Sequence, residues 1–275
     1  MALRLAATMK RLCLSEYLNA DNKWTRRLLG LESFAVQRTS EKIHQEYGRE
    51  KWGRLLEHKL RDVEHAKEVE RDILFGPDWR TQQTALSFKN EIFETTQMLT
   101  LRIYFDLIRT RFESYTAARY CELGCGYGYN LSLFDGVTYG GEFTEAGVTV
   151  GRRLGLDVAR FDFYDRASYK IIRPGSLVFT IQALEQISDT SEFLEGMRSQ
   201  RDKITVVLHL EPAVLPGRRD LFGLLRNRYL ELNDYCRNLV DLLQQAPDVE
   251  ILEFDPDCIG APPLNSLHFI AWRFR

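Results

Sequence analysis

The stretch Glu122-Leu-Gly-Cys-Gly-Tyr-Gly128 decides the fold of this 275-residue chain. Its three glycines follow a strand-like run at residues 118–123 and precede a segment that we expect to be helical. Glycine lets the backbone turn sharply, and it lets a ligand approach the main chain with no side chain in the way. The stretch therefore predicts a nucleotide-like ligand at the end of a strand.

From about residue 112 onward, β-branched or aromatic runs alternate with segments of helical spacing. Strands that are separated by helical crossovers form a mostly parallel sheet with both faces covered. A long helix is expected over residues 218–245, after the fifth strand. The sequence therefore predicts an α/β fold with strands at residues 118–123, 138–143, 158–163, 176–181, 204–210, 249–254 and 267–274.

Residues 1–111 have a different character, because they are rich in charge and show almost no strand-like runs. Apolar residues recur at close to helical spacing over residues 40–74, and residues 84–109 are apolar enough to form a buried helix. Residues 1–11 are basic, which favours a first amphipathic helix, with an organellar transit peptide as the alternative. We therefore expect a helical lid or homodimer contact over residues 1–111 and a sheet domain over residues 112–275.

Two details separate the glycine-rich stretch from the dinucleotide-binding loop G-x-G-x-x-G. Tyr129 stands where that loop has its third glycine, and Glu122 stands two residues before Gly124. A carboxylate at this place repels a pyrophosphate but suits a cationic ligand. S-Adenosylmethionine is such a ligand, because it carries a sulfonium and an ammonium group.

In its acid-x-G-x-G-x-G pattern the stretch resembles the first motif of the class I S-adenosylmethionine-dependent methyltransferases. That family has a Rossmann-like, doubly wound, seven-stranded sheet with an antiparallel last strand. The resemblance covers residues 120 to about 210 well and does not reach the first 110 residues. It implies S-adenosylmethionine as the cofactor, bound by Glu122, Gly124, Cys125, Gly126, Gly128, Glu142, Phe143, Asp162, Phe163 and Gln182.

The resemblance also implies roles for single residues. Glu142, at the end of the second strand, would accept hydrogen bonds from both ribose hydroxyls, as a carboxylate is able to do. Asp162 would lie near the adenine amino group, with Phe163 as a wall of the adenine site. In the alternative interpretation, Glu142 and Asp162 are solvated acids and Cys125 is a small packing residue.

Methyl transfer to a hydroxyl requires alignment of the two reactants and usually a base that removes the proton. His209 and Glu211 lie at the carboxyl end of the fifth strand, where ligands bind in open α/β sheets, and share one face of that strand. His209 as a core histidine is the alternative. Glu185, and with it Gln182, is a second candidate for the base or for a substrate contact.

Three further residues are candidates for substrate binding. Arg218, Arg219 and Tyr229 belong to a segment in which arginines alternate with aromatic residues, a pattern that suits an anionic or sugar-like substrate. A solvated helix face is the alternative. Paired aspartates that would bind magnesium are not evident, so we expect a metal-independent enzyme.

Composition limits the class of partner. The net charge of −2 and the pI of about 6.3 argue against a nucleic-acid partner. The five cysteines lack the spacing of a zinc site or a disulfide framework, and no apolar run is long enough to span a bilayer. We therefore expect a cytoplasmic protein with a small-molecule substrate and no membrane association.

The sequence predicts an S-adenosylmethionine-dependent methyltransferase that acts on a hydroxyl of a sugar or secondary metabolite. The first alternative is N-methylation of an amine, a protein or a peptide. The second is a non-catalytic, methyltransferase-like partner subunit. A nicotinamide oxidoreductase is a third alternative, which Tyr129 and Glu122 disfavour.

Overall fold

The computed structural model describes residues 9–20 and 22–275. Most of the basic opening stretch, for which an amphipathic helix or a transit peptide is predicted, lies outside these residues. None of the helices in the described ranges is long and apolar enough to cross a membrane.

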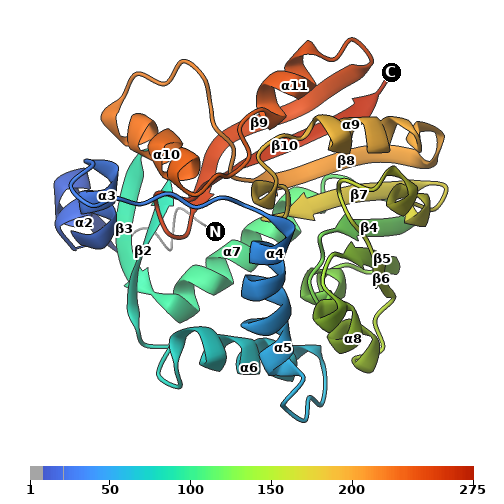
Figure 1. The fold of residues 1–275 in the computed structure, drawn as a ribbon, viewed down its shortest axis with the longest axis horizontal. Coiled ribbons are helices and arrows are strands. Elements are labelled where there is room, and N and C mark those ends of the chain that lie inside the picture. Colours follow the sequence, from blue (N-terminus) through green and yellow to red (C-terminus); the bar gives the residue numbers. More distant parts are fainter. Residues whose placement is uncertain (1–8, 21) are drawn as a thin grey trace.

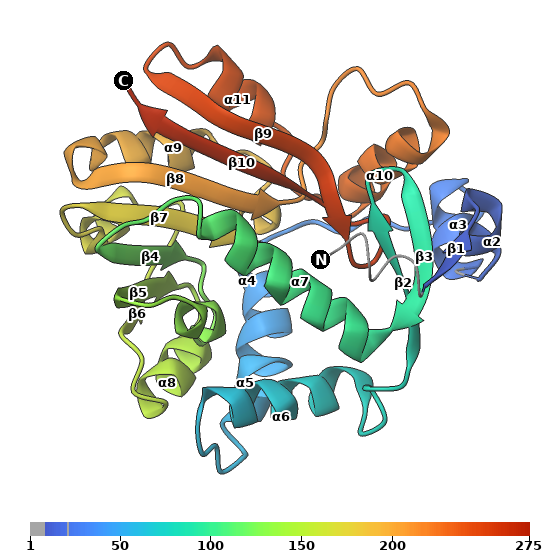
Figure 2. The ribbon, with the colours of Figure 1, turned by 180° about the vertical axis from the view of Figure 1, so that it is seen from behind.

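One sheet of ten strands runs through the molecule, in the order β1-β3-β2-β9-β10-β8-β7-β4-β5-β6 (Figures 1 and 2). Strands β4 to β8 pair in parallel, whereas β10 is antiparallel to both β8 and β9. The strands are β1 (Lys10–Leu12), β2 (Gln83–Phe88), β3 (Glu91–Thr96), β4 (Arg119–Leu123), β5 (Val137–Glu142), β6 (Val158–Arg160), β7 (Ser176–Ile181), β8 (Ile204–Glu211), β9 (Val249–Gly260) and β10 (Ser266–Phe274).

The α-helices lie on both faces of the sheet and beside its carboxyl edge (Figures 1 and 2). They are α2 (Leu14–Ala20), α3 (Asn22–Leu28), α4 (Ser40–Ile43), α5 (Trp52–Leu55), α6 (Val63–Phe75), α7 (Gln97–Phe112), α8 (Glu145–Arg153), α9 (Ser191–Arg198), α10 (Leu221–Leu232) and α11 (Leu239–Gln245). A π-helix (His44–Arg49) follows α4, and short 3-10 helices span Tyr129–Leu133, Arg166–Ile171, Leu184–Gln186 and Arg201–Lys203.

Alternate residues of the central strands pack into two different cores. In β7, Leu177 and Phe179 face the core that contains Phe112 of α7, whereas Val178 faces the core that contains Phe193 and Met197 of α9. This period of two explains why each of these strands reads as a continuous apolar run, since both of its faces are buried. The predicted α/β sheet with helices on both faces is thus confirmed.

The N-terminal part differs from the prediction, because residues 83–96 form a β-hairpin and α7 begins only at Gln97. Lys89 and Asn90 connect the two strands, with Lys89 at φ +52°. The helix prediction over residues 84–109 was therefore wrong in its first half. Two-residue turns and alternating β-branched residues were the overlooked signal. The hairpin extends the sheet beyond β9 through the pair Ser87–Gly260, so the sheet has ten strands and not the predicted seven.

The helix predicted over residues 218–245 is also interrupted. α10 ends at Leu232 and α11 begins at Leu239. Asp234 adopts φ +53° between them, a conformation that aspartate and asparagine tolerate better than most residues do. The Asn233-Asp234 pair therefore breaks the helix at a place where apolar periodicity alone shows no end.

Candidate functional site

The glycine-rich loop lies between β4 and a short 3-10 helix, Tyr129–Leu133, where a longer helix was predicted. Gly124, Gly126 and Gly128 adopt φ of +78°, +57° and +91°, a region that side chains disfavour. A Cβ atom on Gly124 would lie 2.4 Å from the Cβ of Ala183. The first glycine is therefore required both by its conformation and by the close approach of the chain after β7.

A cavity of about 360 Å³ opens beside this loop, at the carboxyl ends of the parallel strands. Its size falls within the roughly 300–1,000 Å³ of typical ligand sites. Nine of the ten residues predicted to bind the cofactor line it, and Gly128 does not. These nine are Glu122, Gly124, Cys125, Gly126, Glu142, Phe143, Asp162, Phe163 and Gln182.

Two buried glutamates lie at the ends of the neighbouring strands β4 and β5. Oε1 of Glu122 accepts a hydrogen bond from Nδ2 of Asn130 at 2.7 Å, whereas its Oε2 is buried and has no protein partner in the described part of the chain. Burial raises the pKa of Glu122 to about 8. An unsatisfied buried oxygen in a cavity wall is a place for a ligand donor.

Glu142 is held against the glycine-rich loop. Its carboxylate accepts hydrogen bonds from the backbone N–H of Gly126 at 3.0 Å and of Thr144 at 2.8 Å, and from the Thr144 hydroxyl at 2.6 Å. Burial raises the pKa of Glu142, while these hydrogen bonds oppose the rise. The backbone N–H of Phe143 also acts on this carboxylate, which has roughly four acceptor positions, so a diol would have to displace a donor such as the Thr144 hydroxyl.

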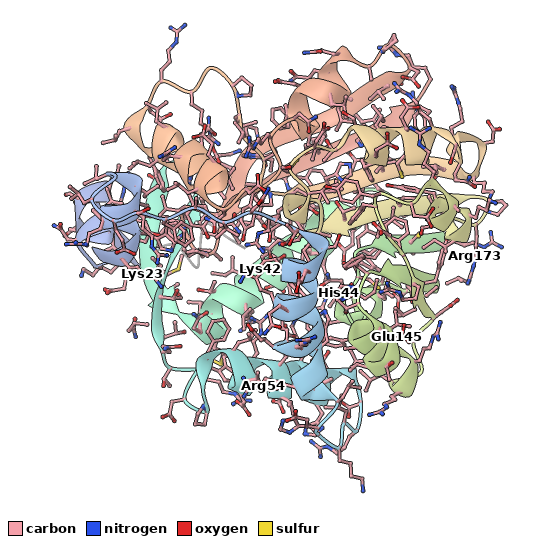
Figure 3. The ribbon with its side chains drawn as sticks, in the orientation of Figure 1. Lys23, Lys42, His44, Arg54, Glu145 and Arg173 are labelled. Carbon is pink, nitrogen blue, oxygen red and sulfur yellow. The ribbon has the colours of Figure 1, made fainter. Side chains whose placement is uncertain are left out.

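Aromatic rings form the end of the cavity beyond β5 and β6. The His44 ring lies 4.6 Å from the ring of Phe143, and Figure 3 shows His44 extending from the π-helix. Asp162 accepts a hydrogen bond from the N–H of Tyr164 at 2.9 Å, and Phe163 packs on Phe161. Phe143 and Phe163, two rings at this end of the cavity wall, offer apolar faces that suit a flat base.

The N-terminal part, for which a helical lid or homodimer contact is predicted, supplies the opposite wall, although none of its residues stood out in the sequence as a candidate for the site. The edge of the Trp52 ring lies 2.8 Å from the position of a Cβ on Gly126, so this glycine is also required by the packing of the tryptophan. The residues of this wall are Ser40, Ile43, Tyr47, Lys51, Trp52, Lys67, Glu70, Arg71, Leu74, Phe75, Tyr104 and Phe105. Residues of α4 to α7 and of the π-helix therefore form one wall of the cavity.

Three cations of this wall surround one carboxylate. Nζ of Lys67 lies 2.9 Å from Glu70 and 4.6 Å from the centre of the Tyr129 ring, and Lys51 lies 4.0 Å from Glu70. Burial lowers the pKa of Lys67 to about 8; it would raise that of Glu70, but the neighbouring cations lower it to about 2. Nε of Arg71 is buried, with no hydrogen-bond partner among the described residues. The group thus carries surplus positive charge next to the cavity.

Glu185 lies in the turn after β7 and lines the same cavity. The residue is only 4% exposed, and burial raises the pKa of its carboxyl to about 7. It accepts hydrogen bonds from Nε2 of Gln186 at 2.9 Å and from Nδ2 of Asn265 at 3.3 Å. A carboxyl that changes its charge near neutral pH is suited to general acid–base work.

Comparison with solved structures places this arrangement among known folds. The [4+2]-cyclase SpnF matches with a TM-score of 0.52 at 14% identity, over 88% of this chain and 98% of the cyclase. The magnesium protoporphyrin IX methyltransferase of Synechocystis PCC 6803, solved with bound S-adenosylhomocysteine, matches with a TM-score of 0.50 at 10% identity, over 85% of this chain and 97% of that one. No protein-family model and no curated protein matches the sequence.

The fold is that of the class I S-adenosylmethionine-dependent methyltransferases. Its seven-stranded core is β6-β5-β4-β7-β8-β10-β9, with β10 antiparallel as expected, and the hairpin β2–β3 and β1 are additions at the β9 edge. Because this fold serves both a methyltransferase and a cyclase among the solved structures, the fold alone does not fix the reaction.

Within this methyltransferase fold, His209 lies in the core behind the cavity and does not line it. Its Nε2 accepts a hydrogen bond from Nε1 of Trp272 at 2.9 Å, so the ring proton is on Nδ1, which donates to Thr180 at 2.8 Å. Burial lowers the pKa of His209 to about 3. The geometry therefore gives this histidine a packing role, which the sequence analysis held as the alternative.

Glu211 is also fully buried and does not line the cavity of the methyltransferase fold. Its carboxylate accepts hydrogen bonds from the backbone N–H groups of Ala183, Leu184 and Glu185 at 2.8 to 3.2 Å. Burial and the nearby Glu185 raise its pKa to about 8. Glu211 thus holds the turn that carries Glu185.

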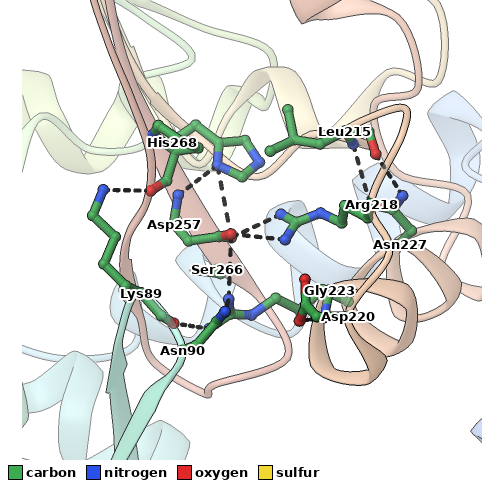
Figure 4. A network of polar contacts seen from close by, with 12 residues as sticks. Lys89, Asn90, Leu215, Arg218, Asp220, Gly223, Asn227, Asp257, Ser266 and His268 are labelled. Carbon is green, nitrogen blue, oxygen red and sulfur yellow. Dashed lines mark hydrogen bonds and ion pairs between the residues drawn. The ribbon is translucent and has the colours of Figure 1, made fainter.

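The three predicted substrate residues lie away from the cavity of this fold. Arg218 forms a two-pronged ion pair with Asp257, at 2.7 and 2.9 Å, in a buried network that ties α10 to β9 (Figure 4). Tyr229 packs against Trp24, and Arg219 is exposed. Arg218 and Tyr229 therefore serve packing between elements, whereas Arg219 is exposed away from the cavity.

Proposed function

We propose that this chain is an S-adenosylmethionine-dependent methyltransferase that acts on a hydroxyl of a small molecule. The observation that carries the proposal is that one cavity is lined by the glycine-rich loop, by Glu142 and by Glu185. The loop and Glu142 offer a donor site, and Glu185 offers a base. The buried position of His209 argues against a role for that residue in proton transfer.

The residues present fit the donor on several independent grounds. Gly124 and Gly126 leave space that a Cβ would fill, and Oε2 of Glu122 is a free acceptor for a cationic N–H donor. Lys67 and Arg71 offer cationic N–H groups for the carboxylate of its amino-acid end. Glu142 would hold the ribose, and Phe143 and Phe163 the adenine. S-Adenosylmethionine, when bound, supplies a methyl group on a positively charged sulfur.

Glu185 is proposed to accept the proton of the acceptor hydroxyl. Its pKa near 7 leaves a large fraction ionised at neutral pH and makes it a stronger base than an ordinary carboxylate. Residues of α4 to α7 line one side of the cavity and limit its contact with bulk water, which strengthens the interaction between charges inside it. The wall residues Leu74, Phe75 and Phe105 give the acceptor a partly apolar surface.

Calorimetry and a transfer assay test the proposal. S-Adenosylhomocysteine is expected to bind with one site per chain, whereas NADH is not. Radiolabelled methyl groups from S-adenosylmethionine are then expected to reach members of a panel of small hydroxyl compounds, with amines as a parallel set. Preference for NADH would refute the proposal, transfer to amines alone would favour N-methylation, and binding without any transfer would favour a non-catalytic subunit.

The pH dependence of turnover follows from the raised pKa of Glu185. A base must be deprotonated to act. Turnover is therefore expected to fall about tenfold per pH unit below the Glu185 pKa of about 7 and to level off above it. The measurement is kcat/KM for the acceptor between pH 5.5 and about 8.5. A rate that rises as the pH falls would be incompatible with Glu185 as the base.

Arg71→Met is expected to weaken binding of S-adenosylhomocysteine about ten- to a hundredfold. A hydrogen bond between charged groups contributes roughly 1.5–3 kcal/mol, and tenfold in affinity corresponds to about 1.4 kcal/mol. Methylthioadenosine lacks the amino-acid end, so calorimetry is expected to show unchanged affinity for it. The control is Arg80→Met, since Arg80 is exposed and does not line the cavity. An equal loss for both ligands would contradict this role.

A further inference from the structure

Arg38 belongs to residues 29–39, which connect α3 to α4 outside the cavity and are called the strap below (Figure 1). Two backbone N–H groups of the strap form hydrogen bonds with the end of α10 and the turn after it. The N–H of Val36 donates to the carbonyl of Leu232, and the N–H of Arg38 donates to Oδ2 of Asp234 at 3.0 Å. The Arg38 side chain is 6% exposed and points inward from the strap. It is buried with its charge, which requires a specific set of partners.

Each nitrogen of the Arg38 guanidinium donates a hydrogen bond to a group of the protein. Nη1 donates to Oε2 of Glu46 and to Oε1 of Gln186, the latter at 3.0 Å, and so uses both of its hydrogens. Nε donates to the carbonyl of Asn233 at 3.2 Å and Nη2 to the hydroxyl of Tyr235 at 3.4 Å. Because the planar fork is rigid, these contacts fix where Oε1 of Gln186 lies.

Gln186 passes this constraint on to Glu185. Its Oε1 accepts from Arg38, so its Nε2 has to face the other way, where it donates to Oε1 of Glu185 at 2.9 Å and to the Tyr47 hydroxyl at 3.0 Å. With the amide reversed, an oxygen would face the Glu185 carboxylate and a nitrogen would face the arginine. By fixing the orientation of the Gln186 amide, Arg38 therefore determines that an N–H donor faces the Glu185 carboxylate.

We propose that Arg38 is a positioning residue for Glu185: through the amide of Gln186 and through its own charge, it orients this carboxylate and stabilises its negative charge. This inference rests on the proposed function only in so far as Glu185 is the base. It extends that function by making the docking of the strap a condition for an active base.

The other groups that face Glu185 frame the expected size of the effect. The burial that raises its pKa is opposed by the hydrogen bond from Asn265, by the charges of Arg38 and Lys51 and by the hydrogen bond from Gln186. Glu211 lies behind the turn and repels it. The ionisable groups around Glu185 are Arg38, Lys51, Glu211, Tyr47, Tyr104 and Tyr235. Of the two cations, Arg38 alone is linked to Glu185 by a chain of hydrogen bonds, through Gln186.

The test measures the pKa of Glu185 directly, without donor or acceptor. The protein is labelled with ¹³C at the glutamate carboxyl carbons, the signal that disappears in Glu185→Gln is assigned, and its shift is followed with pH. In Arg38→Met the pKa of Glu185 is expected to rise from about 7 to roughly 8 or above, because a cation that stabilises the ionised carboxylate is lost. In Arg38→Lys, which keeps the charge, the pKa of Glu185 is expected to rise less.

Arg27→Met is the matched control. Arg27 is a half-buried arginine of the same N-terminal part, it pairs with Glu32 and packs on Phe34, and it has no contact with Gln186. If Arg38→Met fails to fold, Gln186→Met removes the connecting amide and is expected to raise the pKa in the same direction. A pKa of Glu185 that moves no more in Arg38→Met and Gln186→Met than in Arg27→Met would overturn the inference.

Failure of this inference and failure of the proposed function are distinguishable. An unchanged pKa of Glu185 in a protein that binds S-adenosylhomocysteine and transfers methyl groups would overturn the role of Arg38 alone. A raised pKa in a protein that binds no donor would support the role of Arg38 and refute the methyltransferase proposal.

Discussion

Replacing Glu185 by Gln is expected to lower turnover by roughly 10²- to 10⁴-fold, the usual contribution of a general base. The affinity for S-adenosylhomocysteine is expected to remain nearly the same, because the sulfur of this ligand is uncharged and the change keeps the size of the side chain. The structure accommodates the amide: Oδ1 of Asn265 has no hydrogen-bond partner among the described residues, so a reversed Asn265 accepts where it now donates. Single-turnover transfer assays and calorimetry with S-adenosylhomocysteine provide the two measurements.

Glu231→Gln is the control for this variant, since Glu231 is an exposed acid of α10 outside the cavity. In Glu185→Gln the remaining turnover is also expected to show no pH dependence near pH 7, because the group that titrates there is gone. Turnover in Glu185→Gln equal to that of the control would show that the acceptor needs no base or that another group supplies it.

Replacing Glu142 by Ala is expected to weaken binding of S-adenosylhomocysteine about a hundredfold. Hydrogen bonds to a charged group contribute roughly 1.5–3 kcal/mol each, and the loss of one hydroxyl contact near the upper end of this range corresponds to about that factor. The variant also frees the N–H of Gly126, which loosens the glycine-rich loop. Calorimetry measures the affinity, and thermal unfolding shows whether the domain stays folded.

Glu142→Gln and Asp157→Ala make this result interpretable. Glu142→Gln retains an acceptor oxygen and the size of the side chain, so an intermediate loss is expected. Asp157 is an exposed acid before β6 that pairs with Arg173 and does not line the cavity, so its replacement is expected to leave affinity unchanged. Equal affinities in all three variants would remove Glu142 from the donor site.

Much of the fold follows from local sequence. β7 begins and ends at the predicted residues, and β4, β5, β8 and β10 lie within one or two residues of the prediction. β7 and most of β8 are buried on both faces, so their sequences are largely apolar and easily recognised as strands. The hairpin at residues 83–96 was missed because its apolar content also suits a buried helix, and only its alternation and its turn distinguish it.

The site, like the fold, has parts that follow from local sequence and parts that do not. Glycines and acids at the ends of strands share one edge in a parallel sheet, which is why nine of the predicted cofactor residues lie together around the cavity. The base candidates at the end of β8 face the core, since the period-two face of a strand is fixed only by what packs on each side of the sheet. Glu185 and Gln182, the second candidates, are the ones that line the cavity.

The sequence by itself determined the glycine-rich loop, its leading acid and the order of strands that surround it, because each of these depends on residues close together in the chain. Only the tertiary structure decided which residues close the site. Trp52, Lys67 and Arg71 reach Gly126 and the cavity across more than fifty residues of chain, and Arg38 reaches Gln186 across 148. The physical reason is that charges and rings of a covering segment follow no local period, and their role appears only when packing brings them against the sheet.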